Sequence, residues 1–162
     1  MSLVSLIDST LLQPEAEDPR YVNSPFRNLK PLHAKQKGKR FEMIVADVYK
    51  KLGHGVRKAE NTDHDRIVDG YKNEIKGATL VKGKQIFSFL QIRPDQDYEK
   101  MTFAMFYPDD LVMMEMNKAQ IKKCIADGIF KKQHGGNKAN SGTFCYYGNK
   151  ETLTELGAIE IR

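Results

Sequence analysis

The sequence has few cysteines and no long hydrophobic run. The first feature argues against a cysteine metal site, and the second argues against a membrane-spanning segment. Its 162 residues include only two cysteines, Cys124 and Cys145, and their spacing matches no metal site. We therefore expect two buried thiols in a reducing compartment. No apolar run approaches the length that crosses a bilayer, and the N-terminus lacks the basic-then-apolar layout of a signal peptide. These features predict a cytoplasmic protein without a membrane segment.

The composition is that of a folded domain with an excess of basic residues. Hydrophobic residues make up 40% of the chain and charged residues 29%, and the length suits one domain rather than two. The formal net charge is +5, but residues 1–20 carry a net −3, which leaves +8 for the rest of the chain. A basic body with an acidic arm favours a polyanionic partner such as nucleic acid.

Prolines are concentrated near the N-terminus, where they exclude long regular structure. This pattern divides the chain into an N-terminal arm, residues 1–34, and a single domain, residues 35–162. The part of the arm before the first proline could form a short amphipathic helix. The sequence leaves open whether the arm packs on the body or on a second subunit. Four of the six prolines lie in the arm, at Pro14, Pro19, Pro25 and Pro31.

The rest of the chain predicts an α/β fold, with a mixed central β-sheet flanked by helices. From His33 to Leu52, apolar side chains recur at three- and four-residue steps, which predicts an amphipathic helix that ends at Gly53. Residues 85–93 have an ambiguous period, and we predict a short helix there that ends before Pro94. Strands are expected at 55–59, 101–107, 111–116, 143–147 and 159–161, and further helices at 117–126 and 150–156.

The most informative stretch is 63–76, where Asp69-Gly70 predicts the tight turn of a β-hairpin. If Val68 pairs with Tyr71 across this turn, the ladder continues until Asp65 lies opposite Glu74. Two carboxylates in that position repel each other, and a divalent cation between them would reverse the sign of the interaction. Mg²⁺ is commonly held by one or two carboxylates together with phosphate oxygens of the substrate.

The alternation of side chains along the hairpin separates a polar face from a core face. Asp65, Glu74 and Lys76 are expected on the polar face. The core face would carry Val68, Tyr71 and Ile75.

The hairpin residues resemble the active-site signature of the PD-(D/E)XK nucleases, the restriction-endonuclease-like superfamily. The signature falls on Asp65, eight intervening residues, and Glu74-Ile75-Lys76; its leading proline is absent, because His64 precedes Asp65. The expected order of a helix, a strand and then the acid-bearing hairpin also resembles the core of that superfamily. Glu-Ile-Lys-Gly-Ala followed by Phe-x-Gln-Ile-Arg-x-x-Gln-Asp-Tyr is similar to small phage and bacterial type II restriction-endonuclease-like proteins.

This resemblance implies a Mg²⁺-dependent endonuclease that hydrolyses phosphodiester bonds of double-stranded DNA, with Mn²⁺ expected to substitute for Mg²⁺. Asp65, Glu74 and the carbonyl of Ile75 would bind the metal. Lys76 would orient or activate the attacking water. Glu42, in a Gly-x-x-x-Glu setting on the first helix, would reach the same metal site. A restriction enzyme of this kind would act as a homodimer on a palindromic site and leave 5′-phosphates.

Other residues are candidates for contact with DNA or with the reacting groups. The resemblance would place Gln91 and Arg93 near the site, where they could touch the water or a phosphate. Lys39 and Arg40, in the basic first half of the long helix, are candidates for DNA contact. Residues 131–142 form a polar, glycine-rich run without a large hydrophobic anchor, which favours a loop that follows a DNA groove. The loop candidates are Lys131, Lys132, Gln133, His134, Asn137, Lys138 and Asn140.

Several alternatives remain open at this level. The hairpin face could be a solvated surface on which Asp63 forms an ion pair with Lys76, and Glu42 an ordinary surface residue. A non-cleaving DNA-binding protein of the same fold is a second alternative, and a Holliday-junction resolvase or repair nuclease is a third. An HD-type phosphohydrolase is a fourth, indicated by His54 and His64-Asp65, but its site requires helices where the Asp-Gly turn predicts strands.

Overall fold

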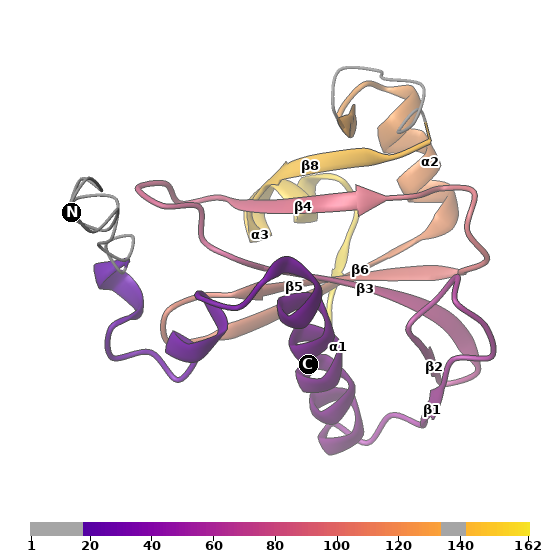
Figure 1. Ribbon diagram of the computed structural model, residues 1–162. Helices are drawn as coiled ribbons and strands as arrows, with labels where there is room; N and C mark the ends of the chain where they lie inside the picture. Colours follow the sequence, from indigo (N-terminus) through magenta and orange to yellow (C-terminus); the bar gives the residue numbers. More distant parts are fainter. Residues whose placement is uncertain (1–17, 134–141) are drawn as a thin grey trace, which may run out of the picture.

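The computed structural model describes residues 18–133 and 142–162, which form a mixed α/β fold (Figure 1). The larger sheet has the strand order β1-β2-β3-β5-β6-β9, and the smaller one has the order β4-β8-β7. Strands of the larger sheet are β1 (Val56–Lys58), β2 (Arg66–Val68), β3 (Tyr71–Thr79), β5 (Lys100–Phe106), β6 (Leu111–Asn117) and β9 (Ile159–Glu160). Those of the smaller sheet are β4 (Phe87–Ile92), β7 (Lys131–Lys132) and β8 (Phe144–Gly148). The helices are α1 (Ala34–Lys51), α2 (Lys118–Ala126) and α3 (Lys150–Glu155).

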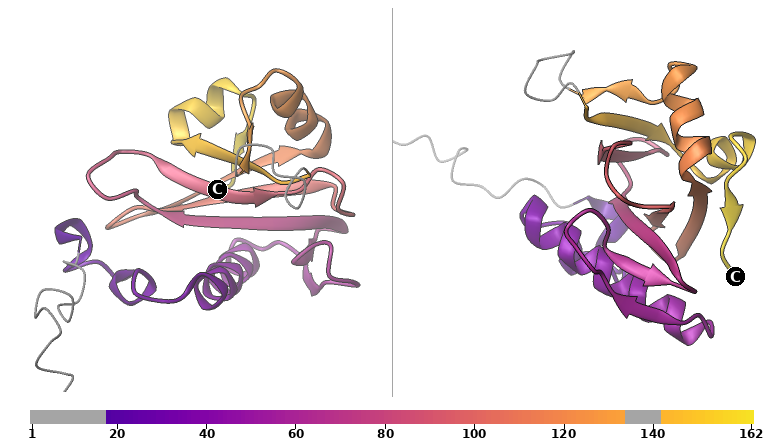
Figure 2. Two further views of the ribbon diagram at one scale, coloured as in Figure 1. Left: turned by 45° about the horizontal axis from the view of Figure 1, so that its top comes forward. Right: turned by 90° about the vertical axis from the view of Figure 1, so that its right-hand side faces the viewer.

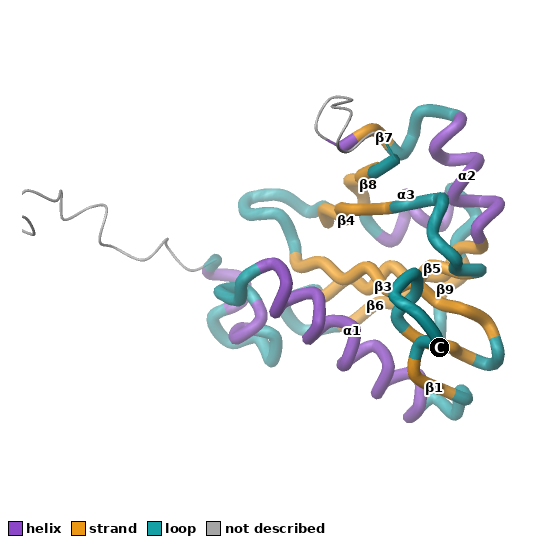
Figure 3. The backbone as a smooth tube through the Cα atoms, turned by 45° about the vertical axis from the view of Figure 1, so that its right-hand side comes forward, coloured by secondary structure: helices purple, strands orange, loops and turns teal. Residues whose placement is uncertain are grey.

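The elements are arranged in three layers around the larger sheet. Strands β3 and β5 are parallel and the other neighbouring strands antiparallel, so the central sheet is mixed. Helix α1 covers one face of β3, β5 and β6, while the smaller sheet, α2 and α3 cover the other (Figures 2 and 3). No helix among the described residues is long and apolar enough to cross a membrane.

Two apolar cores hold these layers together, one on each face of β5. Phe103 faces the smaller sheet, where it packs edge-on against Phe89 at a ring-centroid distance of 5.0 Å. Phe106 faces α1 and stacks on Phe41 at 4.5 Å. Both faces of this strand are buried, as expected for the near-continuous apolar run in its sequence.

The described part of the predicted arm belongs to the folded body. Two short 3₁₀-helices, Pro19–Tyr21 and Arg27–Leu29, precede α1. The Tyr21 side chain is completely buried, and its hydroxyl donates to the carbonyl of Phe106 (2.6 Å) and accepts from the N–H of Leu80 (2.9 Å). The helix predicted before Pro14 lies outside the described residues.

Most predicted elements are confirmed, and one is wrong. The helix at 117–126 begins with a capping box, in which the Asn117 side chain accepts from the Gln120 N–H and the Gln120 side chain accepts from the Asn117 N–H. Residues 87–92, predicted as a helix, form strand β4 instead, because Phe87 and Phe89 enter the core while the strand pairs with the distant β8.

Candidate active site

The β2–β3 hairpin has the predicted turn and register. Asp69 and Gly70 both adopt positive φ, 50° and 87°, as a two-residue hairpin turn requires. The paired residues are Val68 with Tyr71, Ile67 with Lys72 and Arg66 with Asn73, as predicted. Val68 and Ile75 are buried as expected, but the prediction that Tyr71 faces the core is wrong. Tyr71 is 47% exposed because it adjoins the turn, outside both apolar cores, and its ring lies under the Lys100 ammonium.

Asp65 lies one residue beyond the paired part of the hairpin, at the edge of β3. Its N–H donates to the carbonyl of Asn73 (3.0 Å), and its carboxylate accepts from the N–H of Ile75 (2.7 Å). The N–H and C=O of one residue point to the same edge of an extended strand. The Ile75 carbonyl is therefore on the edge of β3 that faces Asp65, where the sequence prediction requires it.

Two further carboxylates lie in the same region, each already paired with cations of the chain. Glu74, 7% exposed, accepts from the Lys76 ammonium at 2.6 Å. Glu42, 9% exposed, accepts from Lys39 (3.2 Å) and from the Arg66 guanidinium. Lys76 does not pair with Asp63, so the alternative of a solvated surface ion pair is excluded, and Glu42 is not an ordinary surface residue.

We call Glu42, Asp65 and Glu74 the acid cluster, because the charges of Glu42 and Glu74 act on Asp65. Burial raises the pKa of Asp65 to about 6, the charges of Glu74 and Glu42 contribute to this rise, and the Ile75 N–H and the Lys76 charge oppose it. A carboxyl whose charge is disfavoured in this way gains most from a cation placed beside it. The structure thus brings together the residues that the sequence singled out.

The acid cluster offers the oxygen ligands that Mg²⁺ prefers, although the metal-free arrangement is not a closed metal site. Among the described residues, no three carboxylate, imidazole or thiol groups are close enough together to hold a metal ion. Two of the three carboxylates are paired with cations of the chain, Glu74 with Lys76 and Glu42 with Arg66. Asp65, Glu74 and the Ile75 carbonyl are the groups that would hold a divalent cation here, and the Lys76 ammonium would have to leave Glu74 for that carboxylate to take part.

Buried polar atoms without partners lie on the elements that flank the acid cluster. Within the described residues, the His64 Nδ1, Asn73 Nδ2 and Tyr98 hydroxyl groups are buried without a hydrogen bond. Tyr98 is 2% exposed, and its pKa is raised by burial and by the nearby charge of Glu74. Such atoms are costly to leave unsatisfied, so each of them calls for a partner that the described part of the chain does not supply.

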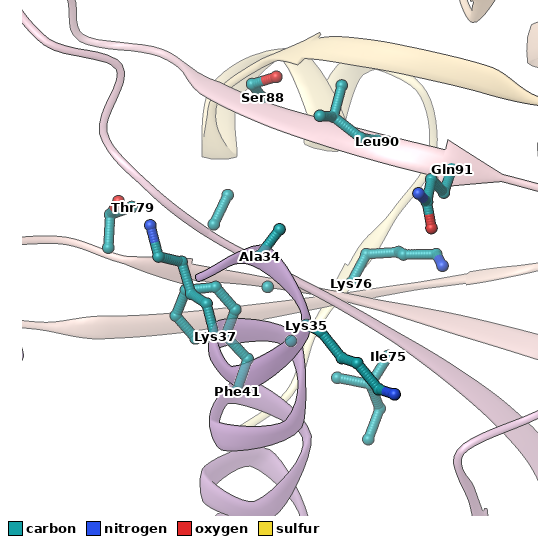
Figure 4. Close-up of a pocket in the computed structure, with 13 residues that line it drawn as sticks. Ala34, Lys35, Lys37, Phe41, Ile75, Lys76, Thr79, Ser88, Leu90 and Gln91 are labelled. Carbon is teal, nitrogen blue, oxygen red and sulfur yellow. The ribbon is translucent and has the colours of Figure 1, made fainter. Parts of the chain in front are cut away.

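Gln91 lines a cleft together with Lys76. It lies at an irregularity in the pairing of β4 with β8, has an unusual positive φ of 56°, and its N–H donates to the Gln133 side chain (2.8 Å). Backbone strain at a non-glycine residue often marks a functional position. The cleft, of about 720 Å³, is lined by the first two turns of α1, by β3 including Lys76, and by Gln91 (Figure 4). We call it the basic cleft, after its three lysines, Lys35, Lys37 and Lys76.

The residues predicted to contact DNA are dispersed. Lys39 adjoins the acid cluster through Glu42, but Arg40 faces a different groove, with Met43 and Asp47, because it lies on another side of α1. Arg93 is exposed at the end of β4. Lys131 and Lys132 are exposed on strand β7, so this part of the predicted loop is wrong, and Gln133 follows them. His134, Asn137, Lys138 and Asn140 lie outside the described residues.

Sequence reasoning missed Arg66, Lys35, Lys37 and Tyr98. The signal for Lys37 was present, because it lies four residues before Phe41 and therefore on the side of α1 that carries the buried stripe. Arg66 and Tyr98 had no such signal, because only the tertiary structure brings them to the acid cluster. The HD-type alternative is excluded by strands on both sides of the turn and by the pairing of His54 with Asp69 at the far end of the hairpin.

Comparison with family models and with curated proteins finds no match to this chain.

Proposed function

We propose that this protein is a Mg²⁺-dependent deoxyribonuclease with the restriction-endonuclease-like fold, which hydrolyses phosphodiester bonds in double-stranded DNA. The observation that carries this proposal is the convergence of the acid cluster and Lys76 at the end of the hairpin, where the pKa of Asp65 is raised. The mixed sheet with α1 on one face and the basic cleft beside Lys76 support it further.

In this mechanism the carboxylates bind the metal ion, and the lysine positions the attacking water. Asp65, Glu74 and the Ile75 carbonyl would hold Mg²⁺, and Glu42 would approach the site from α1. The ion would supply Lewis acidity toward the phosphodiester and the attacking water. Lys76 would leave Glu74 and orient that water for in-line attack, and it would accept the proton of the water only after giving its own proton to solvent. Gln91, across the cleft from Lys76, would contact the water or a phosphate oxygen (Figure 4).

The decisive test is cleavage of duplex DNA in Mg²⁺ or Mn²⁺ by the wild type and by matched variants. Lys76→Ala and Asp65→Asn should each abolish cleavage while folding and DNA affinity persist. Lys72→Ala is the matched control, because Lys72 lies on the same strand and face but pairs with Asp97 on the surface. Cleavage that survives both site variants would exclude this site.

The products distinguish the related substrates. Discrete fragments of plasmid DNA would identify a sequence-specific endonuclease, for which a homodimer is expected. Preferential cutting of four-way junctions would identify a resolvase, and selective cutting at damaged bases a repair nuclease. A non-cleaving DNA-binding protein is disfavoured because Asp65, Glu74 and Lys76 are all present. It would bind DNA with steep salt dependence but leave every substrate intact.

A further inference from the structure

The basic cleft contains cations that the rest of the fold does not neutralise. Lys35 and Lys37, in the first turns of α1, line it together with Lys76 and Gln91. Their side chains diverge in Figure 4, Lys37 to the side of Thr79 and Lys35 to the side of Ile75. Neither lysine makes an ion pair or hydrogen bond with any part of the chain that the structure describes, whereas Lys39 and Lys51 on the same helix pair with Glu42 and Asp47.

Lys37 is the more constrained of the two. Its side chain is half-buried, and burial together with the charge of Lys30 lowers its pKa. A desolvated ammonium without a counter-ion is unfavourable in the free protein, and an anion in the cleft would compensate it.

A glycine in the wall of the cleft has no role in the packing of the fold. Gly38 lies within an 18-residue helix, where glycine is less favourable than alanine. A Cβ at this position would meet no atom within 4 Å, so no neighbour requires its absence. Gly77, which lines the same cleft, differs, since a Cβ there would collide with the Phe41 ring. The absent side chain at Gly38 leaves space on the open side of the helix, where a ligand can approach the backbone.

We propose that the basic cleft binds the phosphodiester backbone of the DNA strand beside the scissile bond, with Lys35 and Lys37 on phosphate oxygens and Gly38 providing room for the strand. Charge complementarity identifies the occupant as a polyanion. The polar side chains of Thr79, Ser88 and Gln91, together with the exposed Leu90, suit a sugar–phosphate chain rather than a bare ion. The position beside the scissile bond rests on the proposed function; the binding of a phosphodiester strand does not.

The first test measures binding without cleavage. A fluorescein-labelled DNA duplex is titrated in EDTA at several salt concentrations, with the wild type and with Lys35→Ala/Lys37→Ala. The double variant should bind about tenfold or more weakly at low salt, and the slope of log K against log salt should fall by about 2, one for each phosphate contact. Lys50→Ala/Lys51→Ala, at the other end of α1, removes the same charge and should leave the slope almost unchanged. Equal slopes for the two double variants would overturn the proposal.

The second test separates ligand space from structural need. Gly38→Ala should raise the melting temperature by about 2–4 °C, because alanine favours the helix. The same variant should bind the duplex several-fold more weakly, because its methyl group enters the space that we assign to the strand. Unchanged binding would overturn the role of Gly38.

The two proposals fail separately. If the wild type does not cleave DNA but the Lys35→Ala/Lys37→Ala variant has a smaller salt slope, the nuclease proposal is rejected and the DNA-binding role of the basic cleft is retained. If the wild type cleaves DNA and the slope of the variant is unchanged, the nuclease proposal is retained and the role of the basic cleft is rejected.

Discussion

Helix α1 takes part in two adjacent regions of different character: an apolar contact with β3 and β5, and the charged region formed by the acid cluster and the basic cleft. Its contact with β3 and β5 is apolar: Phe41 stacks on Phe106 and covers Gly77, while Val45 is completely buried. The polar group in this contact is satisfied, because the Tyr49 hydroxyl lies 2.8 Å from the Thr102 hydroxyl. The apolar contact thus follows the general rules of packing.

The acid cluster and the basic cleft break several of these rules. The first turn of α1 contains no acidic residue and no side-chain N-cap, and it carries lysines at the end where the helix dipole disfavours cations. The charges of Glu74 and Glu42 act on the buried Asp65, and the Tyr98 hydroxyl has no hydrogen-bond partner among the described residues. Departures from the usual capping, charge and hydrogen-bonding preferences are expected where a protein binds a ligand. Substitutions should therefore lower stability in the apolar contact and leave or raise it in the charged region.

The largest effect is expected in the apolar contact. Phe41→Ala should lower the free energy of unfolding by about 3–5 kcal/mol, because it leaves a cavity between Phe106 and Gly77. Met43→Ala, on the exposed side of the same helix, is the control and should change stability by no more than about 0.5 kcal/mol. Urea denaturation measures both, and similar losses for the two would show that α1 does not depend on this contact.

A medium effect of opposite sign is expected at Asp65. Its pKa in the folded protein, about 6, exceeds the ordinary 3.8, so its charge destabilises the fold fully above pH 6 and not below about pH 4. Asp65→Asn should therefore stabilise the metal-free protein by on the order of 2 kcal/mol at pH 8, and this gain should vanish near pH 4.

The measurement is urea denaturation in EDTA at both pH values. In Mg²⁺ at pH 8 the wild type should recover stability and the variant should not. A variant that is less stable than the wild type at pH 8 would show that the Asp65 charge is compensated within the chain.

The smallest effect is expected when a tyrosine is replaced by phenylalanine, once in the apolar contact and once beside the acid cluster. Tyr49→Phe should cost about 1 kcal/mol, since it removes a hydrogen bond to Thr102. Tyr98→Phe should change stability by about zero in the metal-free protein, because it removes a hydroxyl that has no partner among the described residues. Thermal denaturation in EDTA measures the stability of both variants. An equal loss of stability would show that the two regions do not differ in this respect.

Much of the secondary structure could be predicted because its signals are local. The Asp69-Gly70 turn sets the register of the hairpin through backbone geometry alone, and Asn117 caps the following helix through its own side chain. Strand β4 could not be predicted in this way. Its partner β8 lies more than 50 residues further along the chain, and the irregularity at Gln91 interrupts the alternation of its side chains.

The candidate site shows the same division. The sequence by itself determined the hairpin register, the proximity of Asp65, Glu74 and Lys76, and the helix that carries Glu42, because turn chemistry and side-chain periodicity act over a few residues. Only the tertiary structure decided that Arg66 pairs with Glu42, that Arg40 faces away, and that Lys35 and Lys37 line one cleft with Gln91. These outcomes depend on how the layers pack, and packing is set by the burial of apolar surface from distant segments.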